Sequence, residues 1–248
     1  MAASTATKLT LVNNPVCPFG ARAHIAAAEH LKEGDYEVRV ASLSDKPQWF
    51  TDIYRKAIGS DQTSTGKVPV MQDGDTVLCE SAIVAEYIDR KFAADEGSRL
   101  LSDDPLKRAE AQLFVEQFGS RVVGGFYKML WAPAGEKRDA ALAAYTETMK
   151  DLDEALRAKD ARSGTAGPFF DGVRFGWVEV MLFPWLARRS ALSVHRGWEL
   201  PSGAGFERVN AWVAACTARP SVVANTTPGD YYAAQYKSYA EKGDAATA

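Results

Sequence analysis

The 248-residue sequence predicts an α/β unit followed by an all-helical unit. Short apolar strands alternate with amphipathic helices up to about residue 93, and only helical periodicity recurs beyond residue 105. The polar stretch between them is predicted to be a linker. We therefore expect five segments: a disordered lead-in at 1–7, an α/β unit at 8–93, a linker at 94–104, a helical unit at 105–240 and a frayed tail at 241–248.

The elements of the first unit are predicted in the order β-α-β-α-β-β-α. An apolar run at 9–12 and strict alternation at 36–40 predict two strands. Two apolar runs around an Asp-Gly turn predict a hairpin over 68–79. Helices are expected over 18–32, over 47–58 and from Ser81 onward, with Ser81 as the N-cap.

The second unit shows only helical patterns. Gly119, Gly124 and Gly125 predict bends or close helix contacts within its long first helix. Pro184 predicts a kink or an early end to a later helix, because proline lacks the N–H that an interior position needs. The expected helices span residues 105–131, 136–159, 175–190, 204–217 and 229–240.

Cys17 opens the first helix and is the residue with the clearest chemical consequence. A thiol at a helix N-terminus faces unpaired backbone N–H groups and the positive end of the helix dipole. Both favour the thiolate, which is the nucleophilic form. The competing interpretation is a buried structural cysteine, which the position at the helix start disfavours. Cys79 and Cys216 are predicted to be packed core residues. Gly20 stands where the second cysteine of a C-x-x-C pair would lie, so a single-thiol cycle is expected.

Bulk composition excludes several function classes. The formal net charge of −3 and the lack of a basic cluster argue against nucleic acid or an anionic membrane surface as the main partner. No apolar run approaches the ~18 residues of a membrane span. The three cysteines have no C-x-x-C spacing and the three histidines are scattered, so neither a zinc site nor any other metal site is expected. Sparse cysteines also indicate a reducing compartment, and we expect a cytoplasmic location.

The predicted order of elements, with a cysteine on the first βα turn, is the layout of a thioredoxin-like domain. Pro69 supports this interpretation, because a proline that starts a strand is unusual without a local role. In that fold the proline is cis and faces the active cysteine, so a cis peptide bond before Pro69 is a hypothesis here. A thioredoxin-like domain followed by an all-helical domain resembles the cytosolic glutathione transferases.

The motifs resemble most closely the omega class of that family, with the lambda and dehydroascorbate-reductase classes close behind. The resemblance spans roughly residues 8–220 and depends on the stretches taken together. They are Cys17-Pro18-Phe19, Asp45-Lys46-Pro47-Gln48-Trp49-Phe50, Lys67-Val68-Pro69-Val70 with Cys79-Glu80-Ser81-Ala82-Ile83, and Leu100-Leu101-Ser102-Asp103-Asp104-Pro105.

This resemblance implies a site for glutathione as co-substrate. Cys17 would form a mixed disulfide with glutathione, and a second glutathione would resolve it. Glu80 and Ser81 would hold the γ-glutamyl end, although Ser81 could also serve only as a helix cap. The remaining implied glutathione contacts are the backbone of Val68 beside Pro69 for the cysteinyl part, Lys46 or Lys67 for the glycyl carboxylate, and Phe19 beside the thiol.

The second substrate, a small electrophile or disulfide, is expected in a pocket lined by Trp185, Arg188 and Trp212. For the two tryptophans, core packing is an equal alternative, and Arg188 could instead close a helix end or an ion pair. The resemblance also implies a homodimer through the helices near 105–159. One departure is Gly176-Trp177-Val178-Glu179, where the family has a Ser/Thr-x-x-Asp capping box. Another is the long loop over 58–66 beside the glycyl end.

The leading hypothesis is therefore an omega-like glutathione-dependent thiol transferase or dehydroascorbate reductase that acts through Cys17. The alternative is a non-enzymatic protein of the same fold. It could be a chloride-channel-like relative that inserts into membranes, or a carrier that uses the open pocket without turnover.

Overall fold

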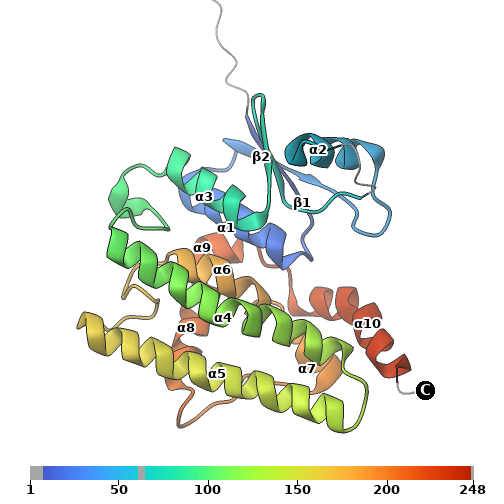
Figure 1. Cartoon of the computed structure of the whole chain (residues 1–248), viewed down its shortest axis with the longest axis vertical. Helices are drawn as coiled ribbons and strands as arrows, with labels where there is room; N and C mark the ends of the chain where they lie inside the picture. Colours follow the sequence, from blue (N-terminus) through green and yellow to red (C-terminus); the bar gives the residue numbers. More distant parts are fainter. Residues whose placement is uncertain (1–7, 61–64, 247–248) are drawn as a thin grey trace, which may run out of the picture. The chain divides into compact units, whose positions relative to one another are not determined.

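The computed structural model of the chain describes residues 8–60 and 65–246. The chain divides into two compact units, Met1–Arg99 and Leu100–Ala248 (Figure 1). The expected lead-in at 1–7 lies outside the described residues. The first unit is α/β and the second is helical, so the predicted fold class is confirmed.

A four-stranded mixed sheet forms the centre of the first unit. Its strand order is β2-β1-β3-β4; β1 pairs with β2 in parallel and with β3 antiparallel, and β3 pairs antiparallel with β4. Leu11 lies opposite Val38 on one side and Met71 on the other. The strands are β1 (Leu9–Asn13), β2 (Tyr36–Val40), β3 (Val70–Asp73) and β4 (Thr76–Cys79).

Helices cover both faces of this sheet. α1 (Pro18–His30) and α3 (Ser81–Phe92) pack on each other on one side, and α2 (Gln48–Ile58) lies on the other (Figure 1). The buried side chains of His30 and Asp89 join α1 to α3 through a 2.8 Å contact between Nε2 and Oδ1. A short 3₁₀ turn, η1 (Glu96–Ser98), precedes the second unit. The sequence pattern therefore predicted every element of the α/β unit except η1.

The second unit is built from helices of very unequal length. The expected helix over 175–190 corresponds to α6 and ends earlier, at Leu186, and the last helix continues beyond residue 240. Neither α7 nor α9 was predicted. The described helices are α4 (Pro105–Trp131), α5 (Glu136–Ser163), α6 (Trp177–Leu186), α7 (Ser190–Arg196), α8 (Glu207–Ala218), α9 (Pro220–Val223) and α10 (Gly229–Ala245).

Pro184 lies inside α6, which ends soon after it at Leu186. Proline supplies no N–H to the helical ladder and crowds the preceding turn, which accounts for the early end. At the other end of the chain, buried Tyr232, Tyr236 and Ala240 fix α10 along its length. Packing of this face explains why the helix persists into the segment that we expected to fray.

The glycines of α4 differ in purpose. A Cβ built at Gly125 would lie 2.5 Å from the Tyr145 ring, so α4 and α5 approach closely there only because Gly125 has no side chain. Gly119 and Gly124 have nothing within 4 Å of an added Cβ. The predicted close helix contact is thus confirmed for Gly125, and neither of the other two glycines is needed for packing.

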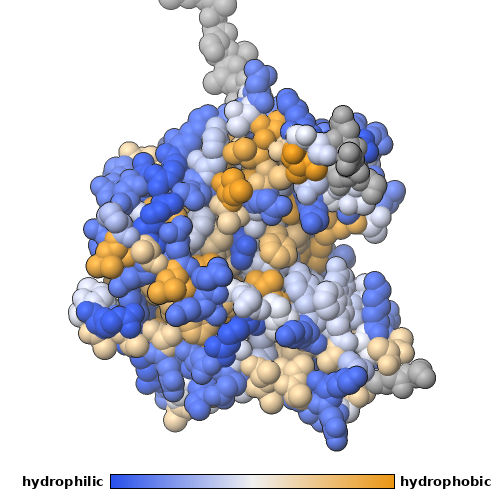
Figure 2. Space-filling view, viewed as in Figure 1, coloured by the Kyte–Doolittle hydropathy of each residue, from blue (hydrophilic) through white to orange (hydrophobic). Residues whose placement is uncertain are grey.

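Figure 2 shows hydrophilic and weakly hydrophobic residues side by side along α5. Exposed charged residues on this helix include Glu136, Lys137, Lys150 and Glu154. Among the residues that the structure describes, none of the helices has the length and apolar character needed to cross a membrane.

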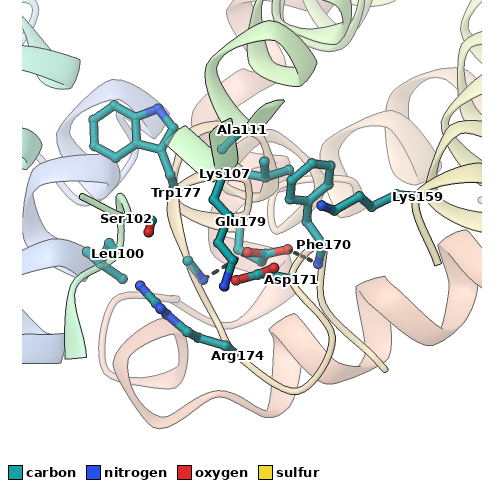
Figure 3. Close-up of a pocket in the computed structure, with 12 residues that line it drawn as sticks. Leu100, Ser102, Lys107, Ala111, Lys159, Phe170, Asp171, Arg174, Trp177 and Glu179 are labelled. Carbon is teal, nitrogen blue, oxygen red and sulfur yellow. Dashed lines mark hydrogen bonds between the residues drawn. The ribbon is translucent and has the colours of Figure 1, made fainter. Parts of the chain in front are cut away.

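Buried Glu179 anchors the start of α6 (Figure 3). Its Oε2 accepts the Gly176 N–H at 2.9 Å, which is the carboxylate half of a capping box. Its Oε1 accepts the Phe170 N–H and the Trp212 Nε1–H, both at 2.8 Å. A Cβ at Gly176 would lie 3.0 Å from the Leu100 carbonyl oxygen, so a side chain at this position would crowd the backbone of Leu100.

Replacing Glu179 by Gln should destabilise the protein by about 1–3 kcal/mol, because an amide cannot accept hydrogen bonds through both terminal atoms. Burial raises the pKa of Glu179 above its usual 4.5, so the folded state binds this proton more tightly than the unfolded chain does. The stabilising advantage of the unaltered protein over the Glu179→Gln variant should therefore shrink as pH rises above about 4.5. Denaturant unfolding across pH measures both effects. Glu154→Gln on the exposed face of α5 is the control, and equal behaviour of the two variants would refute this role.

Candidate active site

Cys17 is the N-cap residue of α1, with an extended backbone (φ −76°, ψ 117°). Its N–H donates to the Asn14 carbonyl oxygen at 3.0 Å, which closes the turn between β1 and α1. The residue is half-buried and packs against an apolar cluster: Val12, Ala41, Phe50, Tyr54, Val68 and Val70. The thiol-bearing residue thus sits at a helix start, as predicted, with one flank against the core.

Arg22, one turn further along α1, is the residue of this site that sequence reasoning missed. Burial lowers the pKa of Arg22 to about 10, while the electrostatic interaction with Cys17 raises it. The guanidinium remains cationic at neutral pH with this pKa. Because the attraction between opposite charges is mutual, Arg22 favours the thiolate of Cys17. An arginine on the otherwise small and apolar face of α1 was the signal that could have identified it.

The same guanidinium links Cys17 to the start of α3. Arg22 Nη1 donates to the Ser81 hydroxyl at 3.1 Å. The Arg22 guanidinium carbon also lies 5.4 Å from the centre of the Phe19 ring, a cation–π contact. Phe19 is 36% exposed, and its ring covers one side of the arginine. The structure therefore brings Cys17, Phe19 and Ser81 together around Arg22.

Glu80 has the backbone conformation that stands out most in the first unit. Its φ of 69° is the only positive value among the non-glycine residues that the structure describes. Such conformations cost about 1–3 kcal/mol and concentrate at functional sites. Glu80 is the N-cap residue of α3, and buried Ser81 is the first helical residue, so the cap lies one residue before the predicted one.

The Val68–Pro69 peptide bond is cis, as hypothesised from the sequence. Both residues are buried, and Val68 belongs to the apolar cluster against which Cys17 packs. The cysteine and the start of the β3 segment are thus neighbours in the fold, although they are far apart in sequence.

Lys46 and Lys67, the two lysines expected at the glycyl end, differ in exposure. Lys46 is half-buried and Lys67 is exposed. Neither makes an ion pair with the residues that the structure describes. Residues 61–64 of the adjoining loop lie outside the described part, so the glycyl-end contacts stay a prediction.

The other two cysteines lie in environments that oppose ionisation. Burial, reinforced by the negative charge of Glu80, raises the pKa of the Cys79 thiol. Burial, reinforced by Glu179, raises the pKa of Cys216 well above its usual value. Both are packed residues, as predicted, and both are thiols in the structure. Within the described residues no group of three or more His, Cys, Asp or Glu side chains could hold a metal ion.

The residues expected to line an acceptor pocket lie in the interior of the second unit. Trp185 and Trp212 are 0% exposed and Arg188 is 1% exposed. Trp212 donates to Glu179, and Arg188 donates through Nη1 to the Pro184 carbonyl oxygen and stacks on Tyr232. These contacts are those of core packing, which was the alternative weighed for the tryptophans. A role for these residues in acceptor binding stays a prediction.

Figure 3 shows a small pocket in the second unit. Its cavity of about 20 Å³ holds roughly one water molecule. Its walls include Ser102, Lys107, Lys159, Phe170, Arg174 and Trp177. Lys159 is already paired with Glu110 at 2.6 Å, so the lining serves the packing of α4 against α5 and the segment before α6.

Known families match both units of the chain. The glutathione S-transferase N-terminal domain matches residues 11–96, and the glutathione S-transferase C-terminal domain matches residues 138–215. The first match falls on the α/β unit that carries Cys17 and the second on the helical unit. The chain therefore belongs to the glutathione S-transferase family, whose co-substrate is glutathione.

Individual relatives share a low sequence identity with this chain over most of its length. Pyrimidodiazepine synthase from Drosophila melanogaster is 28% identical over 221 residues, covering 87% of this chain and 79% of that protein. The probable glutathione S-transferase parC of Nicotiana tabacum is 29% identical over 204 residues, 82% of each protein. The solved structure of glutathione transferase Omega 3C from Trametes versicolor has a TM-score of 0.77 and 26% identity, covering 98% of this chain and 93% of that one. Most curated relatives are Tau-type enzymes.

Replacing Arg22 by Gln should slow the reaction of Cys17 with iodoacetamide at pH 7 by roughly tenfold, equivalent to about 1.4 kcal/mol of lost thiolate stabilisation. The pH profile of the reaction should move to higher pH, because the nearby cation is gone. Mass spectrometry of the Cys17 peptide over time measures the rate. Arg90→Gln, which removes an exposed arginine paired with Glu86 on α3, is the control. An unchanged pH profile in the Arg22 variant would show that Arg22 does not support the thiolate.

Proposed function

We propose that the chain is an omega-like, glutathione-dependent thiol transferase that also reduces dehydroascorbate, with Cys17 as its nucleophile. The observation that carries the proposal is the position of Cys17: an N-cap cysteine in electrostatic contact with a partly buried arginine. A helix N-terminus and a neighbouring cation both stabilise a thiolate. The raised pKa values of Cys79 and Cys216 leave Cys17 as the thiol best suited to react.

The proposed reaction has two exchange steps. The Cys17 thiolate attacks the glutathione sulfur of a mixed disulfide between glutathione and an acceptor, and the acceptor leaves as its thiolate. A second glutathione thiolate then attacks the glutathione sulfur bound to Cys17. Oxidised glutathione leaves, and the Cys17 thiolate is regenerated. Each step breaks one S–S bond and forms another, so the protein needs no metal or further cofactor for this exchange.

We propose that glutathione is held against this thiol by groups at the start of α3, beside Pro69 and in the segment before α2. The N–H groups at the start of α3 suit the γ-glutamyl carboxylate, and Glu80 suits its ammonium. The unusual backbone of Glu80 supports a functional role at this point. Val68 would pair through its backbone with the cysteinyl part of glutathione. Lys46, and secondarily Lys67, would meet the glycyl carboxylate.

The omega-like class is part of this proposal. Its support is the Cys17-Pro18-Phe19 motif together with the similarity to Omega 3C. The Tau-type relatives favour conjugation of glutathione to electrophiles as a second candidate activity. Conjugation is disfavoured because a conjugating enzyme donates a hydrogen bond from a Tyr or Ser hydroxyl to the glutathione sulfur. A cysteine at this position instead forms a disulfide with that sulfur. We therefore propose thiol transfer as the main reaction, with small disulfides and electrophiles as the acceptor substrates.

We further propose a cytoplasmic homodimer that contacts its partner subunit through the helices near 105–159. Leu106 and Leu113 support this assembly, because they lie seven residues apart on one face of α4 and are 69% and 58% exposed. Large exposed apolar side chains aligned along one helix face are typical of protein–protein contacts. For the two non-enzymatic alternatives, membrane insertion and ligand binding without turnover, the described residues offer no feature comparable to the N-cap cysteine beside an arginine.

Replacing Cys17 by Ser should lower thiol-transferase activity by roughly a hundredfold or more, because the covalent intermediate can no longer form. Conjugation of glutathione to an aromatic electrophile should not fall with it. Steady-state assays with a glutathionylated peptide, with dehydroascorbate and with the electrophile measure these activities.

Cys79→Ser is the matched control, and it should retain thiol-transferase activity. Full activity in the Cys17 variant would contradict the proposed mechanism. Absence of turnover in the unaltered protein with all three substrates would favour a ligand carrier instead.

A further inference from the structure

The turn that carries Cys17 is held by two consecutive asparagines at the end of β1. Asn14 Oδ1 accepts the Val16 N–H at 3.1 Å, and Asn14 Nδ2 donates to the Ala41 carbonyl oxygen at 2.8 Å. The Asn14 carbonyl oxygen accepts the Cys17 N–H. Side-chain bonds of this kind stabilise a turn in place of a regular backbone ladder. Asn14 thus ties the cysteine directly to the sheet.

Asn13 supports Asn14 from beneath. Its side chain is buried, with the residue 5% exposed, and its Oδ1 accepts the Asn14 N–H at 2.7 Å. The Asn13 carbonyl oxygen also accepts the Ala41 N–H at 2.9 Å, next to the Asn14 bond to the same residue. The chain of contacts therefore runs from the Asn13 amide through Asn14 to the backbone of Cys17.

Gly20 supplies the space for the Asn13 amide. A Cβ built on Gly20 would lie 1.6 Å from Asn13 Oδ1 and 2.7 Å from Asn13 Cγ. Real Cβ atoms do not approach other atoms this closely, so one of the two groups must move. Asn13 is buried and its Oδ1 already accepts the Asn14 N–H, so moving the amide away from a Cβ at residue 20 would disturb the contact that supports the turn.

We propose that Asn13 is a positioning residue for the Cys17 thiol and that its amide can occupy its place only while residue 20 lacks a side chain. The consequence is chemical as well as structural. Residue 20 is where a C-x-x-C pair would place its second thiol, so the Asn13 amide excludes an internal resolving cysteine. This consequence deepens the proposed function, on which it rests, by explaining why the second thiol comes from glutathione.

A four-variant cycle tests this: the unaltered protein, Gly20→Ala, Asn13→Ala, and the double variant. The measurements are the melting temperature and the pH profile of Cys17 alkylation by iodoacetamide, followed on the Cys17 peptide by mass spectrometry. Alkylation does not involve glutathione, so this test can fail or succeed independently of the proposed transferase activity. A loss of stability alone would leave the pH profile of Cys17 alkylation unchanged, whereas a misplaced Cys17 thiol would shift that profile.

With Asn13 present, Gly20→Ala should lower the melting temperature and slow Cys17 alkylation at pH 7 at least roughly threefold. With Ala in place of Asn13, the same change should raise or preserve the melting temperature, because alanine forms helix better than glycine, and should leave alkylation unchanged. Gly119→Ala is the matched control, since that helical glycine has nothing within 4 Å of an added Cβ. Equal effects of Gly20→Ala in the two backgrounds would overturn the proposal.

Discussion

The attraction between the Cys17 sulfur and the partly buried guanidinium of Arg22 is the interaction on which the candidate active site depends. A helix N-terminus favours a thiolate by itself, and the cation adds to this at a position where much of the water is excluded. Arg22 in turn donates to the Ser81 hydroxyl, so one side chain interacts electrostatically with Cys17 and bonds to the start of α3. The strand order makes this possible, because β1 and β3 are adjacent and deliver Cys17 and Val68 to the same apolar cluster.

A different constraint organises the helical unit. Glu179 is buried and accepts three hydrogen bonds, from two backbone groups and from Trp212. A buried carboxylate without such partners would be strongly destabilising, so the segment before α6 and the helix α8 must both be in place around it. The same arrangement takes Trp212 into the interior. The reactive thiol and the groups around Arg22 all belong to the α/β unit.

Most of the α/β fold could be predicted from the sequence because its signals are local. Alternating apolar residues indicated β2, the Asp73-Gly74 turn indicated the hairpin, and Pro18 after Cys17 marked the start of α1. Arg22 could not be assigned in the same way, since its role depends on Ser81, far along the chain. Likewise, the sequence indicated only that Gly20 takes the place of a C-x-x-C cysteine. Its close approach to Asn13 is a tertiary contact.

The helical unit was harder to predict for the same physical reason. Helical periodicity does not distinguish a tryptophan that lines a pocket from one that packs inside, and both Trp185 and Trp212 are fully buried. Helix ends also depend on packing. α10 continues to Ala245 because its apolar face is covered, whereas the polar composition of the tail suggested that the helix would end earlier. The capping motif could be recognised from the sequence, but the close approach of Gly176 to the backbone of Leu100 could not.

The central claim is that Cys17, and no other cysteine of this chain, carries glutathione as a mixed disulfide. Peptide mass spectrometry of the protein after incubation with oxidised glutathione tests it most directly. The account predicts one adduct of glutathione, located on Cys17 and removed by added reduced glutathione. An adduct on Cys79 or Cys216 with Cys17 unmodified, or no adduct at all, would contradict it.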